Sequence, residues 1–450
     1  MLEMRRFLAI SITLSSLAVI SSVNRAEEFN PELGAMIVWA GDSITHQCGY
    51  TQYLENFLYT RFHDKKLRFA NAGIKGDRAG DLLDRFDEDV AKWQPQYVTL
   101  LLGMNDGRYQ EFDRENFAVY QRDVNTVLDR LNEIEARPVI LSPTLFDHRQ
   151  YTIRYEDPDF RFKRLSVHEE YNAKLAFYGG WLRNVARTRS LDYLDLWGSM
   201  NDFTTRFRRD HQSFTLMPDS IHPNPDGMAL MAVEMARYFA GSRVEASRVE
   251  FKRLTDGRVT VGGNVVLHHF DRDGLEATVT PGSLPWVLPA SGKIGPAPWN
   301  YLDDPSKGFR AALEVLPINN DLLSVSGLGQ GVYEVLMDGV IVLIAESDDL
   351  VRGISLQSNP ESPSFKQSCE LAGLNAKRND EAVRPYRDVQ GKMKGARRKF
   401  DGNSVAFAAA QKEIQVELDE LQLLAEKMEG EIHRIAVPEP YDLEIRRFTR

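Results

Sequence analysis

The stretch "VWAGDSITHQCGY", residues 38–50, places Ser43 directly after a short apolar run. Short apolar runs bounded by turn residues are typical of buried strands, and the following "TQYLENFLYTRF" has the apolar spacing of a helix. A strand that turns directly into a helix leaves the turn at the carboxyl end of the strand, where parallel α/β sheets gather their functional groups. Ser43 is therefore either a nucleophile or a turn residue that caps the next helix.

The pattern of strand and helix continues outward from this stretch over residues 34–243. Further strand-like runs are "LRFANAG", "YVTLLLG", "RPVILSPT" and "LDYLDLW", and helical segments such as "NFAVYQRDVNTVLDRLNEI" lie between them. Alternating strands and helices predict a parallel sheet covered on both faces. The closing segment "HPNPDGMALMAVEMARYFAG" predicts a helix with Asn224 as its cap, Pro225 in its first turn and Gly241 at its end.

The pattern changes in the C-terminal half. Residues 245–355 contain β-like runs, and Asp338-Gly339 between two of them predicts a hairpin, so we expect a small β-rich domain. Residues 362–437 predict a helical hairpin, because apolar residues recur at steps of four and three from Ile414 to Ile435. We expect its basic stretch "KMKGARRKF" to pair with the acidic flank "ELDELQLLAEKMEGE", with a polyanion-binding site as the weaker alternative.

The N-terminal residues 1–26 have the layout of a secretory signal peptide. Two arginines are followed by the apolar run "FLAISITLSSLAVISSV" and then by a polar segment. We therefore expect a periplasmic or secreted protein, with an uncleaved membrane anchor as the alternative. The two cysteines, Cys48 and Cys369, are too few and too far apart for a disulfide scaffold, and we expect them to be unpaired thiols.

The composition is that of an ordinary globular protein with room for two or three domains: 450 residues, 43% hydrophobic and 27% charged. The formal net charge of −10 argues against a nucleic-acid partner, because phosphate binding needs a concentrated basic surface. No phosphate-binding loop, dinucleotide glycine motif or metal-binding helix motif occurs in the sequence, so we expect no cofactor and no metal. The lipase-type Gly-x-Ser-x-Gly elbow is also absent, which argues against an ordinary α/β-hydrolase.

The sequence also offers partners for Ser43 in catalysis. A serine hydroxyl becomes an effective nucleophile only when a base removes its proton and a third group orients that base. Among the nine histidines, His222 has the best setting, because Asp219 precedes it by three residues in "MPDSIHPNPDG". Donors for an oxyanion are the N–H of Ser43, Gly76 in "NAGIKGDRAG" and Asn105 in "LLGMNDG". Taken singly, each of these signals is weak and fits an ordinary turn or cap.

Together, the blocks "GDSIT", "NAGIKGD", "LLGMND" and "DSIHP" resemble the four sequence blocks of the GDSL, or SGNH, hydrolase family. The resemblance implies a flavodoxin-like three-layer α/β/α fold for residues 34–243. It also implies a catalytic triad of Ser43, Asp219 and His222, and an oxyanion hole of Ser43, Gly76 and Asn105. The resemblance does not reach the C-terminal two hundred residues.

Two positions depart from the pattern of this family. Ile44-Thr45 stands where the family name has leucine, which is common in carbohydrate-esterase-like branches, and Met104 replaces a glycine, which could narrow the site. Among the other polar residues, we expect His46 to line a pocket or cap a helix rather than act as the base. We expect Asp42 and Asp106 to fix loops by hydrogen bonding.

Two charged, aromatic stretches, with His148 in the first and His211 in the second, either bind substrate or are merely solvated. Their arginines and tyrosines suit a polar or sugar substrate. The sequence thus predicts a serine ester hydrolase that removes short acyl groups, above all acetyl, from a small-molecule or polysaccharide ester. The alternatives are a lysophospholipase or thioesterase, and a cell-envelope binding protein with a vestigial site.

Overall fold

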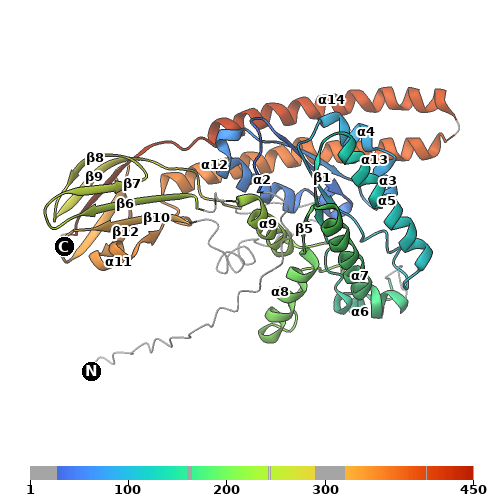
Figure 1. The fold of residues 1–450 in the computed structure, drawn as a ribbon, viewed down its shortest axis with the longest axis horizontal. Helices are drawn as coiled ribbons and strands as arrows, with labels where there is room; N and C mark the ends of the chain where they lie inside the picture. The colour runs from blue at the N-terminus through green and yellow to red at the C-terminus, as the bar shows by residue number, and fades with distance from the viewer. Residues whose placement is uncertain are drawn as a thin grey trace.

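The computed structural model describes residues 28–159, 165–241, 243, 245–288, 320–401 and 403–448. The predicted signal peptide, residues 1–26, lies outside them. The described chain forms an α/β part, a β-sheet part at one end of the molecule and a long helical hairpin that runs along the α/β part (Figure 1). Within these ranges, none of the helices is both long and apolar enough to cross a membrane.

The α/β part is built on a five-stranded parallel sheet with the order β2-β1-β3-β4-β5. The strands are β1 (Met36–Gly41), β2 (Arg68–Gly73), β3 (Tyr97–Leu101), β4 (Arg137–Leu141) and β5 (Asp192–Leu194). This is the flavodoxin-like strand order, in which the chain changes direction along the sheet next to β1. The fold class predicted from the sequence is confirmed.

Helices cover both faces of this sheet, and the side chains of β1 show the division. Ile37 and Trp39 point into one core with α2 (Gly49–Arg61), α8 (Leu196–Asp210) and α9 (Pro225–Ala240). Val38 and Ala40 point into the other core with α3 (Ala79–Leu83), α4 (Phe86–Asp89), α5 (Arg114–Glu133) and α7 (Leu165–Arg189). Burial on both faces explains why the strand reads as a continuous apolar run.

The predicted closing helix is confirmed as α9. The side chain of Asn224 accepts a hydrogen bond from the Gly227 N–H at 2.9 Å, Pro225 occupies the first turn, and Gly241 ends the helix. The loop before this helix contains the "DSIHP" block. The cap therefore fixes where that block lies relative to the sheet.

The β part consists of two sheets that enclose their own apolar core. The first has the order β13-β10-β6-β7 and the second β12-β11-β14-β9-β8. The bounds are β6 (Ser247–Arg253), β7 (Val259–Gly262), β8 (Asn264–Phe270), β9 (Gly274–Thr280), β10 (Asp321–Ser326), β11 (Val332–Met337), β12 (Val340–Glu346), β13 (Ile354–Ser355) and β14 (Tyr441–Arg447). Asp338-Gly339 joins β11 to β12, as predicted.

The strand β14 differs from the sequence prediction, which ended the β-rich region at residue 355. It lies in the middle of the second sheet, paired with β11 and β9, although it follows the helical hairpin in the chain. Its inward residues Tyr441, Leu443 and Ile445 are buried. Their spacing of two is a strand signal, but charged residues alternate with them in a run of only seven. The helical hairpin is thus an insertion between two strands of one β part.

The hairpin consists of α12 (Pro363–Arg378), a π-helical turn (Asn379–Val383), α13 (Arg384–Lys399) and α14 (Ser404–Ile435). Leu418, Met428 and Ile432 of the predicted seam are buried. Two further helices are α6 (His148–Glu156) and α11 (Ser347–Arg352). The hairpin packs on the α/β part and adds Ile432 to its core.

The basic stretch of α13 pairs with two different partners. Lys392 contacts Glu417 of α14 at 3.0 Å, as the sequence prediction required. Arg397 and Arg398 instead contact Glu88 and Asp81 of the α/β part, both at 2.8 Å. The stretch therefore ties the hairpin to the rest of the protein.

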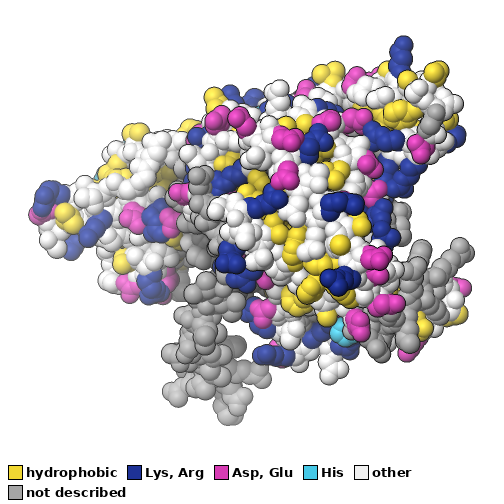
Figure 2. All heavy atoms as spheres, turned by 45° about the vertical axis from the view of Figure 1, so that its right-hand side comes forward, with side chains coloured by type: hydrophobic (Ala, Val, Ile, Leu, Met, Phe, Trp, Pro, Cys, Tyr) yellow, Lys and Arg dark blue, Asp and Glu magenta, His cyan; other side chains and the backbone are white. Residues whose placement is uncertain are grey.

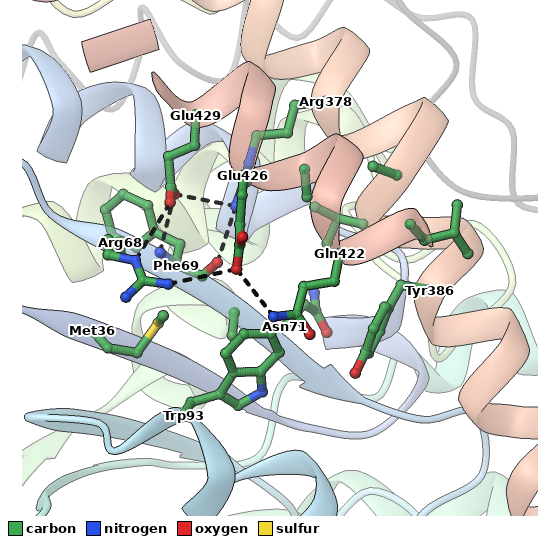
Figure 3. A pocket seen from close by; sticks show the side chains of 15 residues that line it. Met36, Arg68, Phe69, Asn71, Trp93, Arg378, Tyr386, Gln422, Glu426 and Glu429 are labelled. Atoms are coloured by element: carbon green, nitrogen blue, oxygen red, sulfur yellow. Dashed lines mark hydrogen bonds and ion pairs between the residues drawn. The ribbon is translucent and has the colours of Figure 1, made fainter. Parts of the chain in front are cut away.

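Side chains of the hairpin also complete the exposed edge of the sheet. β2 is an edge strand, and its outward backbone groups would otherwise be unpaired. Four hydrogen bonds cover them: His433 Nε2 to Leu67 O at 2.9 Å, Glu429 Oε1 to Phe69 N at 3.2 Å, Arg378 Nη2 to Phe69 O at 3.0 Å and Arg387 Nη1 to Asn71 O at 2.7 Å. Figure 3 shows Arg378 and Glu429 beside Phe69. The cavity left there, about 40 Å³, is far below the ~300 Å³ at which ligand pockets begin.

Candidate active site

Ser43 lies at the first position of the short helix α1 (Ser43–His46), directly after β1. The side chain of Asp42 caps this helix by accepting the Ile44 N–H at 2.9 Å. The helix sits tightly on the end of β2, because a Cβ atom at Gly73 would lie 2.4 Å from the backbone nitrogen of His46. Ser43 is 7% exposed, so its hydroxyl is held in a nearly closed environment.

The structure brings His222 and Asp219 to Ser43. Ser43 Oγ lies 2.9 Å from His222 Nε2, and His222 Nδ1 lies 2.6 Å from Asp219 Oδ2. The other carboxylate oxygen of Asp219 accepts the backbone N–H groups of Ile221 and His222 at 3.0 and 2.7 Å. Ser220 has a φ of +81°, in the left-handed region, which lets the chain turn tightly enough for these contacts.

The protonation of this group follows from its hydrogen bonds. Burial acts to raise the pKa of Asp219, but the hydrogen bonds from the His222 ring and from two backbone N–H groups outweigh it, and the pKa is lowered. Asp219 is therefore a carboxylate that accepts the Nδ1–H of His222. The lone pair of His222 Nε2 is then available to the hydroxyl proton of Ser43.

Asn105 connects the predicted oxyanion residues. Its amide nitrogen donates to the carboxylate of Asp42, next to Ser43, at 3.2 Å and to the backbone oxygen of Asp77, next to Gly76, at 3.0 Å. Gly76 has a φ of +72°, and a Cβ atom there would meet nothing within 4 Å. Its backbone thus borders open space. The loops after β1, β2 and β3 are joined at one edge of the sheet.

Asp42 and Asp106 fix these loops, as the sequence predicted. Asp106 accepts the backbone N–H groups of Ala79 at 2.9 Å and Gly103 at 3.0 Å. Burial raises the pKa of both carboxyl groups to about 7. Their role is to hold backbone in place rather than to act on a substrate.

The remaining predicted positions lie around this centre. Met104 is buried in an apolar cluster with Phe146 and Tyr171. His148 and His211 are exposed at the ends of α6 and α8. His46 is buried, and its Nε2 contacts Asp388 of α13 at 3.0 Å. Cys48 and Cys369 are both free, as expected.

Three neighbours of the site were not found from the sequence. Tyr109 donates its hydroxyl to Asn105 Oδ1 at 3.1 Å, and its spacing of four from Asn105 is a signal that could have identified it. Arg154 of α6 donates to the backbone oxygen of Asp219 at 2.6 Å. Asp388 contacts the site from a distant part of the chain, and no local pattern marks it.

A charged cavity of about 390 Å³ adjoins the loops that carry Gly76 and Asn105. It is lined by residues that include Arg78, Asp81, Asp84, Asp106, Arg108 and Arg122. Figure 2 shows one face of the molecule, on which Lys and Arg are interspersed with Asp and Glu. Across the described part of the chain, no three His, Cys, Asp or Glu side chains are grouped in a way that could hold a metal ion.

Comparison with known proteins identifies what the α/β part is similar to. Residues 40–230, which contain all four blocks, match the GDSL-like lipase/acylhydrolase family. The match covers the α/β part of the chain and identifies that part as a GDSL-like acylhydrolase domain. The GDSL-like enzyme is thus a carboxylic ester hydrolase.

Two relatives of this GDSL-like hydrolase are informative. An acetylxylan esterase from Geobacillus stearothermophilus is 23% identical over 223 residues, which cover 44% of this chain and 91% of the relative. A solved gut microbial diltiazem-metabolizing enzyme matches 94% of this chain and 100% of its own with a TM-score of 0.76, at 19% identity. The second likeness shows the fold alone, but over nearly the whole chain.

Proposed function

We propose that the GDSL-like hydrolase removes short acyl groups, above all acetyl, from a carbohydrate or a similarly polar ester. Ser43 is the nucleophile, His222 the general base and Asp219 the group that orients His222. The hydrogen bonds from Ser43 through His222 to Asp219, at 2.9 and 2.6 Å, carry the proposal. This is the arrangement that a serine needs to become nucleophilic.

The reaction has two steps. The Ser43 oxygen attacks the ester carbonyl as its proton passes to His222 Nε2, and the tetrahedral adduct collapses when the bond to the alcohol breaks and His222 returns the proton to the leaving oxygen. Water then loses a proton to His222 and attacks the acyl-serine; the bond from the acyl carbon to the Ser43 oxygen breaks, His222 returns the proton to that oxygen, and the carboxylic acid leaves. In both steps the N–H groups of Ser43 and Gly76 stabilise the oxyanion, and the amide of Asn105 joins them by exchanging one of its present acceptors, Asp42 or the Asp77 carbonyl, for the oxyanion.

The substrate class is supported by two observations. The adjoining cavity is lined by arginines and aspartates, which suits hydroxyl-rich substrates better than a long acyl chain. A relative at 23% identity bears the name acetylxylan esterase. A lysophospholipase or thioesterase on the same residues is the second candidate, and the exposed Phe112 and Phe177 beside a cavity of about 350 Å³ favour it. The proposed setting is outside the cytoplasm, from the signal-like residues 1–26.

The test is a comparison of turnover by the purified full chain. The substrates are p-nitrophenyl acetate, butyrate and palmitate, then acetylated xylooligosaccharide against lysophosphatidylcholine and acetyl-coenzyme A. We expect kcat/KM to fall with acyl length and the oligosaccharide to be preferred. Ser43→Ala should abolish turnover, whereas Ser213→Ala, at an exposed serine, should not. A preference for palmitate or for the lysolipid would contradict the substrate, and an active Ser43→Ala would contradict the mechanism.

A further inference from the structure

The helix α13 contacts the short helix α1, which carries Ser43, and the loop that carries Gly76, although α13 lies outside the residues that match the family. Asp388 Oδ1 lies 3.0 Å from His46 Nε2 and 3.3 Å from Lys75 Nζ. His46 follows Ser43 by three residues, and Lys75 immediately precedes Gly76. One carboxylate oxygen therefore bridges the nucleophile helix and the oxyanion loop. Arg384 adds a contact to the Gln47 carbonyl, at the end of the nucleophile helix, at 3.4 Å.

A second contact holds the other side of Gly76. Lys394, on the same helix, pairs with the buried carboxylate of Asp77. The backbone oxygen of Asp77 in turn accepts the amide of Asn105 at 3.0 Å. The two neighbours of Gly76 in the chain, Lys75 and Asp77, are thus both held by α13.

The surroundings of His46 determine that it donates the hydrogen bond and that Asp388 accepts it. The His46 side chain is 2% exposed, and its Nδ1 has no hydrogen-bond partner among the described residues. Burial lowers the pKa of His46, although Asp388 opposes this, so the ring is neutral and donates through Nε2. The hydrogen bond from His46, with Lys75 nearby, lowers the pKa of Asp388 to about 2. Asp388 is therefore always the acceptor under working conditions.

We propose that Asp388 is a positioning residue of this esterase: by joining His46 to Lys75 it sets the distance between Ser43 and the Gly76 N–H. The inference rests on the proposed function, in which both groups act on the same carbonyl carbon and oxygen. Stabilisation of an oxyanion depends on donor positions within a few tenths of an ångström. A loose Gly76 loop would weaken binding of the transition state and leave binding of the ester nearly unchanged.

The experiment compares Asp388→Ala, Asp388→Asn and Asp388→Glu in the full-length protein. Lys392→Met is the matched control, because it removes a charge pair from the same helix away from Gly76. We measure kcat and KM for p-nitrophenyl acetate and the inhibition constant of 1,1,1-trifluoro-2-butanone, whose serine adduct carries the oxyanion. The melting temperature and circular dichroism spectrum report the folded fraction.

We expect Asp388→Ala to lower kcat by ~10–100-fold with KM within ~2-fold of wild type, because a misplaced donor acts on the transition state. The inhibition constant of the ketone should rise by a factor similar to that for kcat. Asp388→Glu should restore most of the activity, Asp388→Asn should lie between, and Lys392→Met should match wild type. Unchanged kcat in Asp388→Ala, or a loss explained by unfolded protein, would overturn the proposal.

Ser43→Ala in the same series separates this proposal from the proposed function. If Ser43→Ala is inactive and Asp388→Ala is fully active, only the positioning role is wrong. If Ser43→Ala is fully active, the catalytic assignment is wrong and the positioning role is overturned with it.

Discussion

Two histidine–carboxylate pairs lie close to Ser43 in the chain or in space, and they differ in what their second nitrogen meets. His222 is bonded to Asp219 through Nδ1, and its Nε2 faces the Ser43 hydroxyl. His46 is bonded to Asp388 through Nε2, and its Nδ1 is buried without a partner in the described structure. The same pair of groups can thus move a proton or fix a loop. What the second ring nitrogen faces decides which.

The largest effect is expected when the first pair is disrupted. Asp219→Asn keeps the shape of the carboxylate but removes its charge and favours the wrong tautomer of His222, so the lone pair no longer faces Ser43. We expect kcat to fall by ~10³–10⁴-fold, as in other serine hydrolases with this change. Stopped-flow acylation with p-nitrophenyl acetate measures it. A loss below about tenfold would remove Asp219 from the proposed mechanism.

The second effect concerns how the hairpin that carries Asp388 is held. Arg378 is buried and contacts Glu55 at 3.4 Å, Glu429 at 3.3 Å and the backbone oxygen of Phe69. Arg378→Met leaves the buried carboxylate of Glu55 without its cation and leaves Glu429 with the longer contact to Arg68 at 4.0 Å, so we expect a loss of ~3–5 kcal/mol in the free energy of unfolding. Urea denaturation measures it, with Arg378→Lys as the variant that keeps the charge.

If Arg378→Met is as stable as wild type, the buried pair does not hold the hairpin. A folded Arg378→Met variant with normal kcat would further show that the contacts of α13 form without the buried Arg378 of α12. Contacts made by α13 itself would then be sufficient to hold Asp388 against His46.

The site residues that could be predicted from the sequence are those marked by local patterns. The features that could not be predicted depend on contacts between segments far apart in the chain. Ser43, Gly76 and Asn105 each follow an apolar run, and the sheet order places all three at one edge. Asp219 and His222 lie in one turn, so their contact is readable from a spacing of three. The strand 441–447 carries only a short alternation and Asp388 carries no local signal, because their partners are separated from them by up to 342 residues.

The third prediction is the pH dependence of the second pair. Burial lowers the pKa of His46 below its ordinary 6.5, so the unfolded chain binds the proton more readily than the folded protein. The contribution of neutral His46 to the free energy of unfolding is therefore complete above pH 6.5 and is lost as the pH falls below that value. His46→Gln keeps a donor for Asp388 but does not titrate. The stability of wild type relative to His46→Gln should therefore decline between pH 7 and pH 5 in urea denaturation, and a rise over that range would contradict a neutral His46.

The smallest effect is expected at an ion pair that, unlike the buried pairs of Arg378, is exposed to solvent. Lys392 and Glu417 join α13 to α14 at 3.0 Å, with side chains 57% and 49% exposed. Solvent screening and the loss of side-chain freedom offset most of their attraction, so Glu417→Gln should cost no more than ~1 kcal/mol and leave kcat unchanged. Urea denaturation at low and high salt measures this cost. A loss as large as that of Arg378→Met would mean that charge pairs within the hairpin are what mainly stabilise it. The buried contacts with β2 and with the Gly76 loop would then follow from the position of the hairpin and would not determine that position.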